Sequence, residues 1–391
     1  MKIKIITFIS YFLPGYKAGG PLRSIVNLVN HLNDEFEFWI VTRDRDLGDS
    51  SPYNGVLQNQ WQSVAGAMVY YLPPEDVTIK NMAKIINSTP HDILYLNSFF
   101  AFDFTIKPLL ARRLKLLLNK PVILAPRGEF SSGAIKIKKF KKTFFIRFSK
   151  ILKLYSGVVW QASSEHEAQD LINILKVSRS SIFISLNLPA RMKISNLERV
   201  YARSTPLSSN LRIVFLSRIS PKKNLDYALM VLRKVRVNVV FDIYGPSEDE
   251  EYFAICKNLI KQLPVNIVVN IFGSAHPDQV LSIFNNYDLF FFPTRGENYG
   301  HVIAEALSVG TPVLLSDQTP WRNLKDDGLG WDLPLYEEAK FVEVIEEYSR
   351  VDKNEKEHKR KNIKEKIFYR LSDSQVLEDN RNLFKSVTLN S

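Results

Sequence analysis

The chain contains 391 residues, of which 45% are hydrophobic and 24% are charged. This length suits two domains of roughly 150–200 residues each, and the composition excludes wholesale disorder. The single cysteine, Cys256, excludes a disulfide framework and a cysteine-based metal site, and it is typical of a reducing compartment. The net charge of +11 indicates an anionic partner. Charge alone leaves open whether that partner is a phosphate group, a phospholipid surface or nucleic acid.

The chain begins with Met-Lys-Ile-Lys-Ile-Ile-Thr-Phe-Ile-Ser. This short apolar run has no small-residue cleavage site after it, so it predicts a buried first strand rather than a signal peptide. No stretch reaches the roughly 18 apolar residues that are needed to span a bilayer. We therefore expect a cytoplasmic protein whose only contact with a membrane would be peripheral, at the cytoplasmic face of the inner membrane.

Short apolar runs alternate with amphipathic helical runs along the whole chain. Most of the apolar runs are continuous, as in strands that are buried on both faces of a parallel sheet. The alternation predicts an α/β protein with doubly wound parallel sheets. Strands are expected at 2–9, 36–42, 68–72, 92–98, 121–126, 157–163, 211–217, 238–244, 266–272, 288–293 and 311–316.

The pattern restarts after the polar stretch 191–210, which predicts two Rossmann-like domains that face a central cleft. We assign 1–195 to an N-terminal domain and 205–365 to a C-terminal domain. Residues 366–391 are expected to form a C-terminal helix that packs back on the N-terminal domain. Ligands of such folds bind at the carboxyl ends of the strands.

Two glutamates bracket a predicted helix start in the second half. The run Glu297-Asn-Tyr-Gly-His-Val-Ile-Ala-Glu305 follows the strand 288–293 through a short loop. The helix is predicted to begin near Tyr299 and to stop before Gly310. Its free N–H groups and its positive dipole end form a site for a phosphate or diphosphate. Each carboxylate could accept hydrogen bonds from vicinal hydroxyls on one side of that diphosphate.

A basic cluster follows the strand 211–217 in the same predicted sheet. It reads Ser217-Arg218-Ile-Ser-Pro-Lys222-Lys223-Asn224, so that its cations lie at a strand's carboxyl end, just before another helix. Cations at this place can neutralise a diphosphate and stabilise it as a leaving group. Taken alone, such a pair of basic residues is more typical of a solvated surface. The order of both clusters at α/β loops favours a site.

Together these motifs resemble the retaining glycosyltransferases of family four, the group 1 glycosyltransferases, which have the two-domain GT-B fold. The resemblance implies transfer of a hexose-type sugar from a nucleoside-diphosphate sugar, with no metal or cofactor. It implies that the N-terminal domain, 1–195, binds the acceptor and that the C-terminal domain, 205–365, binds the nucleotide sugar. Arg218 and Lys223 would contact the donor diphosphate. Glu297 would face the donor sugar and Glu305 would hold the ribose. The implied catalytic residues are Glu297, Arg218 and Lys223, and the implied donor-binding residues are Gly19, Gly20, Arg218, Lys223, Asn298, Tyr299, Gly300, His301 and Glu305.

The resemblance also implies a glycan or lipid-linked acceptor and a pathway of cell-surface polysaccharide synthesis, such as lipopolysaccharide, capsule or exopolysaccharide. We expect no metal, because the histidines show no metal-ligand spacing. The sequence Asp44-Arg45-Asp46 matches the metal motif of a different glycosyltransferase fold, but it lies in a polar loop.

Candidates on the acceptor side lie at predicted strand ends in the first half. The paired glycines Gly19 and Gly20 allow close approach of backbone to a ligand, although a plain turn explains them equally. The strand 121–126 ends before Arg127 and Glu129, at a place where many relatives have a histidine. We expect both side chains to face the cleft, and for Arg127 both ligand binding and a structural ion pair stay open.

His166 is a further cleft candidate, because it follows the predicted strand 157–163. A capping serine followed by acidic residues explains the same segment without chemistry. Residues 133–155 are basic and interleaved with Phe and Ile, and no acidic residue occurs between Glu129 and Glu165. This pattern predicts either a membrane-surface helix or an ordinary helix with its lysines in water.

Two other functions compete with sugar transfer. A basic module that binds nucleic acid would explain the charge, but the chain has no helix-turn-helix, RNP-type or zinc signature. That alternative also leaves Glu297 and Glu305 unexplained, so we expect no nucleic-acid partner. A GT-B phosphorylase or epimerase would share the architecture, but no clear pyridoxal-type lysine site is present.

Overall fold

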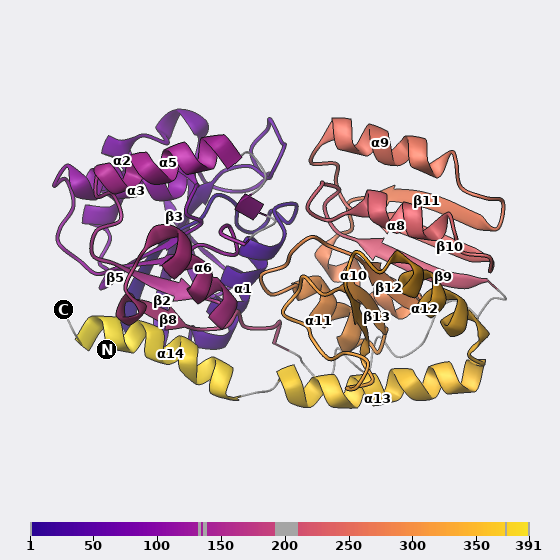
Figure 1. Cartoon of the computed structure of the whole chain (residues 1–391). Helices are drawn as coiled ribbons and strands as arrows, with labels where there is room; N and C mark the ends of the chain where they lie inside the picture. Colours follow the sequence, from indigo (N-terminus) through magenta and orange to yellow (C-terminus); the bar gives the residue numbers. More distant parts are fainter. Residues whose placement is uncertain (1, 132–133, 136–138, 192–209, 372–373, 390–391) are drawn as a thin grey trace. The chain divides into compact units, whose positions relative to one another are not determined.

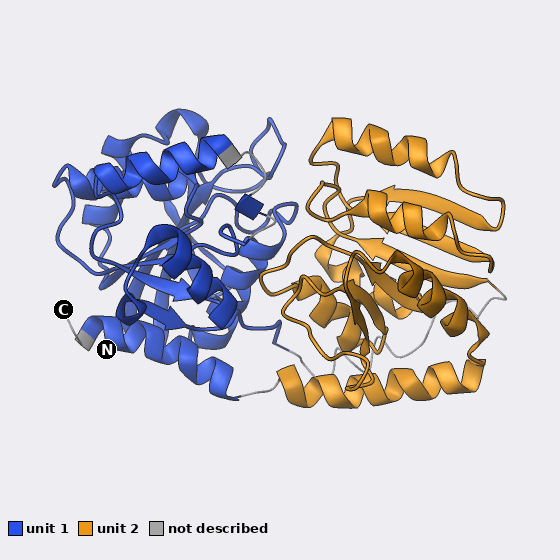
Figure 2. Ribbon diagram, in the orientation of Figure 1, with its two compact units in different colours: residues 1–191, 374–391 blue, residues 192–373 orange. Residues whose placement is uncertain are grey.

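A computed structural model of the protein shows an α/β chain that divides into two compact units (Figures 1 and 2). Unit 1 comprises residues 1–191 and 374–391, and unit 2 comprises residues 192–373. The predicted linker 191–210 lies, apart from its two ends, outside the described residues. The structure describes residues 2–131, 134–135, 139–191, 210–371 and 374–389.

Unit 1 contains one eight-stranded sheet with the order β3-β4-β2-β1-β5-β6-β7-β8. All neighbouring strands are parallel except β3 and β4, which are antiparallel. The strands are β1 (Ile3–Phe8), β2 (Phe36–Arg43), β3 (Trp61–Val64), β4 (Ala67–Leu72), β5 (Ile93–Asn97), β6 (Val122–Ala125), β7 (Val158–Ala162) and β8 (Ile182–Ile184).

Helices enclose both faces of this sheet, which explains its continuous apolar strands. Ile93 and Tyr95 of β5 belong to one core, whereas Leu94 and Leu96 belong to the core on the other face. The helices are α1 (Gly20–Leu32), α2 (Ile79–Ser88), α3 (Lys107–Arg113), α5 (Lys139–Ile151), α6 (Glu165–Leu175) and α14 (Ser374–Leu389), with the single turns η1 (Pro74–Asp76), η2 (Phe102–Ile106) and η3 (Arg179–Ser181).

The last helix of the chain, α14, completes the core of unit 1. The Phe384 ring lies 5.5 Å from the ring of Phe36 and 5.5 Å from that of Tyr95, measured between centroids. At the helix surface, Arg381 Nε donates to Glu35 Oε1 at 2.6 Å. The segment that we expected as one C-terminal helix, 366–391, is therefore divided between two helices. Its first residues end α13 in unit 2, and its later residues form α14 on unit 1.

Unit 2 contains a six-stranded, wholly parallel sheet with the order β11-β10-β9-β12-β13-β14. Its strands are β9 (Leu211–Leu216), β10 (Val239–Tyr244), β11 (Ile267–Gly273), β12 (Leu289–Phe292), β13 (Val313–Ser316) and β14 (Gly330–Leu333). Its helices are α8 (Leu225–Leu232), α9 (Glu250–Ile260), α10 (Pro277–Asn285), α11 (His301–Ser308), α12 (Glu338–Arg350) and α13 (Lys353–Leu371).

The predicted fold class, with two Rossmann-like parallel-sheet domains, is confirmed, and each predicted strand overlaps an observed one. Three strands were missed: β3, β8 and β14. All three are short, with four, three and four residues, and all three lie at sheet edges, where a half-exposed strand needs no continuous apolar run. The predicted cleft between the two domains stays a prediction.

The contacts of α14 predict that this helix contributes to the stability of unit 1. We expect Phe384→Ala to lower the free energy of unfolding of unit 1 by about 3–5 kcal/mol, because it leaves a cavity among fully buried rings. Urea denaturation followed by hydrogen exchange of the β1 and β5 amides measures this loss. The control is Tyr369→Ala on α13, which removes an exposed ring. Equal effects of the two changes would show that α14 does not stabilise unit 1.

Candidate active site

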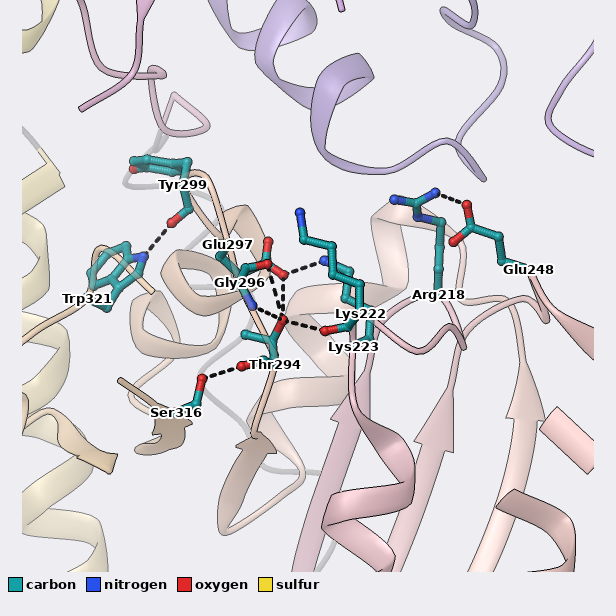
Figure 3. A network of polar contacts seen from close by, with 10 residues as sticks. All are labelled: Arg218, Lys222, Lys223, Glu248, Thr294, Gly296, Glu297, Tyr299, Ser316 and Trp321. Carbon is teal, nitrogen blue, oxygen red and sulfur yellow. Dashed lines mark hydrogen bonds and ion pairs between the residues drawn. The ribbon is translucent and has the colours of Figure 1, made fainter. Parts of the chain in front are cut away.

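The candidate site lies at the carboxyl end of the sheet in unit 2. Because β9, β10 and β12 are parallel neighbours, the loops that follow them meet at one edge. Figure 3 shows the side chains of Arg218, Lys222 and Lys223 extending beyond the strand ends, with Glu297 beside Lys223. Arg218 and the two lysines come from the loop after β9, and Glu297 comes from the loop after β12.

Hydrogen bonds join these two loops directly. Asn224, which precedes α8 in the left-handed conformation, donates from Nδ2 to the Pro293 carbonyl at 2.8 Å. Its Oδ1 accepts from Arg295 Nε at 2.8 Å. The Lys222 carbonyl accepts from the backbone N–H of Arg295 at 2.8 Å and from Thr294 Oγ1 at 3.1 Å. The positions of Lys223 and Glu297 are therefore fixed relative to each other by their backbones.

Lys223 and Glu297 form a largely buried ion pair in which Lys223 Nζ donates to Glu297 Oε1. Thr294 Oγ1 lies 3.2 Å from the same carboxylate oxygen. Burial acts to raise the pKa of the Glu297 carboxyl, but the charges of Lys223 and Lys222 outweigh it and leave that pKa below its usual value. We conclude that Glu297 is ionised at neutral pH.

Positive charge is crowded around this pair. Burial lowers the pKa of the Lys223 ammonium, Arg218 and Lys222 lower it further, and Glu297 opposes them without reversing the direction. The structure records no ion pair of Lys222 among the residues that it describes. A bound anion would relieve the repulsion among the three cations, so the loop after β9 is suited to a phosphate ligand.

Arg218 has a partner that the sequence analysis did not single out. Its Nη1 lies 2.6 Å from Glu248 Oε1, on the loop after β10. That loop passes against the loop after β9, because the Glu248 N–H donates to the Ile219 carbonyl at 3.1 Å. Gly245 permits the approach, since an added Cβ would lie 1.7 Å from the Ser217 carbonyl oxygen. No motif includes Glu248, and its only signal is its place after a strand of the same sheet.

The helix between the two motif glutamates begins at His301, and the predicted start near Tyr299 is wrong. Gly300 precedes it with φ 78°, and an added Cβ would lie 2.7 Å from Ile303 Cδ1. This left-handed residue keeps Asn298 and Tyr299 in the loop. Glu305 is half-buried on α11, about one turn beyond His301. No side chain caps the start of α11 by hydrogen bond.

Trp321, which belongs to no motif in the sequence, holds the loop before α11 in place. Its buried indole donates from Nε1 to the Tyr299 carbonyl at 2.6 Å. The Arg370 guanidinium lies 4.9 Å from the centroid of the same indole. The Tyr299 ring in turn lies 4.7 Å from the ring of His301. The shape of the loop from Glu297 to Gly300 therefore depends on a residue that follows β13.

The candidates of unit 1 have mainly structural contacts. Arg127 has φ 58°, and its guanidinium donates to Tyr95 Oη at 2.6 Å, to Asn97 Oδ1 at 2.8 Å and to Asn187 Oδ1. All these partners are neutral, so among the described residues the ion pair left open for Arg127 is not formed. The guanidinium charge instead lies half-buried at the carboxyl ends of β5 and β6.

We had expected the Glu129 side chain to face the cleft. Its carboxylate instead makes hydrogen bonds inside unit 1. It accepts from Ser98 Oγ at 2.6 Å and from the N–H groups of Phe99 and Phe100 in the loop after β5. Burial raises the pKa of the Glu129 carboxyl, although these hydrogen bonds oppose the rise. Glu129 thus orders the loop after β5.

His166 is exposed on α6, in a segment whose hydrogen bonds form a helix cap. The N-cap Ser164 accepts from the Glu167 N–H at 3.1 Å, as the capping alternative predicts. Glu167, which the sequence analysis did not single out, is buried and accepts from the N–H groups of Gly128 and Ser163. It therefore joins the loops that follow β6 and β7.

The paired glycines lie at the start of α1 in unit 1, and the motif residues lie in unit 2. Gly19 is the N-cap of α1 with φ 72°, and an added Cβ at Gly20 would meet no atom within 4 Å. In the described part of the chain, no group of three or more His, Cys, Asp or Glu could hold a metal ion. None of the described helices is long and apolar enough to cross a membrane.

Residues 202–366 match the model of the family "Glycosyl transferases group 1". The chain is 25% identical over 284 residues to an "Uncharacterized 41.2 kDa protein in cps region" of Klebsiella pneumoniae, an alignment that covers 70% of this chain and 74% of that protein. The segment that matches the family model contains Arg218, Lys223, Glu297 and Glu305.

Solved structures resemble the whole chain. Anabaena HepE in complex with UDP and glucose has a TM-score of 0.69 at 14% identity, and the match covers 99% of both chains. WaaG, a glycosyltransferase involved in lipopolysaccharide biosynthesis, has a TM-score of 0.67 at 12% identity, with 99% of this chain and 98% of WaaG covered. These matches show that the fold is GT-B, and the match to the family model is confined to residues 202–366.

The Trp321 contact predicts a local effect on the loop before α11. We expect Trp321→Phe to raise hydrogen exchange of the amides between Glu297 and Ile303 about fivefold, because one hydrogen bond is worth about 1 kcal/mol. The matched control is Trp331→Phe on β14, whose ring lies against Tyr348. Unchanged exchange in the loop would mean that the indole does not hold it.

Proposed function

We propose that the protein is a retaining glycosyltransferase that moves a hexose-type sugar from a nucleoside-diphosphate sugar to a glycan or lipid-linked acceptor. The observation that carries this proposal is the largely buried Lys223–Glu297 pair, formed between the loop after β9 and the loop before α11, with further cations beside it. The resemblance of the fold to HepE, which has been solved with UDP-glucose, supports a nucleotide sugar as donor.

In this proposal the donor diphosphate binds between the loop after β9 and the start of α11. Arg218, Lys222 and Lys223 supply positive charge, and the uncapped N–H groups of α11 add hydrogen-bond donors. These groups stabilise the negative charge that develops on the leaving diphosphate. Glu305 lies about 6 Å further along α11 than His301, where its carboxylate can accept hydrogen bonds from the ribose hydroxyls.

Glu297 orients the donor sugar and opposes the positive charge that develops as the glycosidic C–O bond breaks. Its lowered pKa keeps the carboxylate ionised for this role at neutral pH. We propose that the acceptor hydroxyl attacks from the face that the diphosphate leaves, which retains the anomeric configuration. A new C–O bond forms, the bond to the diphosphate breaks, and the hydroxyl proton passes to a phosphate oxygen. Domain closure would exclude water from this step.

We propose that no metal or other cofactor is needed, because three cationic side chains supply the charge that a divalent ion supplies elsewhere. On the acceptor side, we propose that Arg127 binds acceptor oxygens, since its described partners are neutral. The Gly19–Gly20 turn would approach the donor phosphates. His166 is exposed and is kept as an acceptor candidate only.

The biological setting is also proposed. The relative from Klebsiella pneumoniae is encoded in a cps region, and WaaG acts in lipopolysaccharide biosynthesis. We infer that this protein acts in cell-surface polysaccharide synthesis, such as lipopolysaccharide, capsule or exopolysaccharide. We further propose that it works at the cytoplasmic face of the inner membrane, where lipid-linked intermediates are available.

A panel of UDP-, GDP- and ADP-sugars tests the central assignment by slow donor hydrolysis. We expect one nucleotide class to be hydrolysed, and Glu297→Ala to reduce that rate on the order of 10²-fold, since it removes charge stabilisation at the reacting sugar. The matched control is Glu347→Ala, an exposed glutamate on α12. Full activity of Glu297→Ala would refute the role of Glu297, and no hydrolysis of any donor would count against the proposed function.

The role of Arg218 is tested separately by binding of the free nucleoside diphosphate. We expect Arg218→Ala to weaken the affinity about tenfold or more, because a hydrogen bond to a charged group is worth about 1.5–3 kcal/mol. Isothermal titration calorimetry measures the dissociation constant, and Arg350→Ala on α12 removes the same charge at an exposed place. Equal affinity of the Arg218 variant and the wild type would contradict this role.

A further inference from the structure

Helix α5 carries large apolar side chains on the face that is turned to solvent. Phe140, Phe144 and Ile151 are 92%, 74% and 78% exposed, and Phe148 is 49% exposed. The rings of Phe144 and Phe148 stack with centroids 6.5 Å apart. A helix on the surface of a globular protein normally turns polar residues outward. Among the described residues, nothing covers the outer face of α5, so its apolar side chains are available to a partner outside the chain.

The inner face of α5 is formed by other residues, so the outer face is not needed for the core. Ile146 and Ser149 are buried, and Phe145 packs against the core of unit 1. At 100° per residue, Phe140, Phe144, Phe148 and Ile151 fall within one arc of about 80°, opposite the buried residues. The helix thus has two separate apolar faces, and only one of them is used in folding.

Basic side chains flank the outer face and indicate the charge of its partner. Lys141 and Arg147 are exposed on either side of the apolar arc, and Lys150 and Lys153 are exposed near the helix end. No acidic residue occurs in the sequence between Glu129 and Glu165. An acidic protein surface would pair with the basic side chains but would not bury the aromatic rings that lie between them. An anionic bilayer meets both, because its headgroups attract the cations and its acyl boundary accepts the rings.

A second apolar and basic segment lies near the end of α5. Residues 114–120 read Leu-Lys-Leu-Leu-Leu-Asn-Lys, and Leu114, Leu116 and Leu118 are exposed. Arg112 Nη1 donates to the Ser156 carbonyl at 2.7 Å, which joins the end of α3 to the loop after α5. The two segments can therefore contact one membrane surface together.

We infer that the outer face of α5, with residues 114–118, is a membrane-binding surface of unit 1 for an anionic phospholipid leaflet. Phe140, Phe144, Phe148 and Ile151 enter the boundary between headgroups and acyl chains, and the flanking cations contact lipid phosphates. That this contact brings a lipid-linked acceptor to the enzyme rests on the proposed function, but the surface itself does not.

Vesicle flotation of the full-length protein tests this surface. We expect binding to vesicles that contain phosphatidylglycerol and at least tenfold weaker binding to phosphatidylcholine alone. The triple change Phe140→Ser, Phe144→Ser and Phe148→Ser is expected to weaken binding to the anionic vesicles at least tenfold. The matched control changes three exposed apolar residues of unit 2 and should bind as the wild type does: Ile255→Ser, Val265→Ser and Tyr336→Ser.

A second comparison separates this surface from the general positive charge of the chain. Changing Lys141, Arg147 and Lys150 to Gln should weaken vesicle binding more than the same change at the exposed Lys325, Lys353 and Lys361 of unit 2. Equal losses would overturn the proposal in favour of bulk charge. If the triple serine variant also unfolds more easily, the single change Phe140→Ser carries the test, with an expected loss of about threefold.

Other outcomes would also overturn the proposal. One is a wild-type protein that does not float with anionic vesicles, and another is a triple serine variant that floats as well as the wild type. Light scattering that shows a dimer dissociated by the serine changes would assign the face to a second copy of the chain. Donor hydrolysis is measured on the same variants without vesicles. A wild-type protein that binds anionic vesicles but hydrolyses no donor would contradict the proposed function and would still support the membrane-binding surface.

Discussion

The ion pair between Lys223 and Glu297 depends on the hydrogen bonds that hold two loops of unit 2 against each other. Asn224 is one of these connections, because its amide contacts both the Pro293 carbonyl and the Arg295 side chain, and the Lys222 carbonyl is another. Without these hydrogen bonds, nothing in the loop backbones would bring two charged side chains from distant parts of the sequence together in a largely buried position. The backbone geometry of the two loops therefore positions the pair, and the attraction between the opposite charges adds to it.

Much of this site could be predicted from the sequence, because it follows from strand order and local motifs. Parallel strands bring the loops after β9 and β12 to one edge, and the glutamates mark the second loop. Glu248 and Trp321 could not be predicted, since their contacts exist only after separate loops have met. The start of α11 was misplaced because Gly300 was taken as part of the helix, whereas its left-handed backbone can only precede it.

In this structure, each of two cations in the cluster is matched by a carboxylate. Glu248 pairs with Arg218 and Glu297 pairs with Lys223, so both basic side chains are already oriented before any ligand is considered. A diphosphate would compete with Glu248 for Arg218, which lowers the gain from binding but avoids the cost of ordering a free side chain. In unit 1, Arg127 is oriented by neutral oxygens instead, so a ligand there would meet no competing carboxylate.

The path of the chain has a consequence for how the protein is made. The core of unit 1 includes Leu383, Phe384 and Val387, which follow the whole of unit 2 in the chain and are therefore synthesised after it. The core of unit 1 can therefore be completed only after all of unit 2 has been synthesised. During that interval the surface that α14 later covers, including Phe36, Phe38 and Tyr95, is open to solvent and to chaperones. Expression of residues 1–191 alone would leave that surface permanently uncovered.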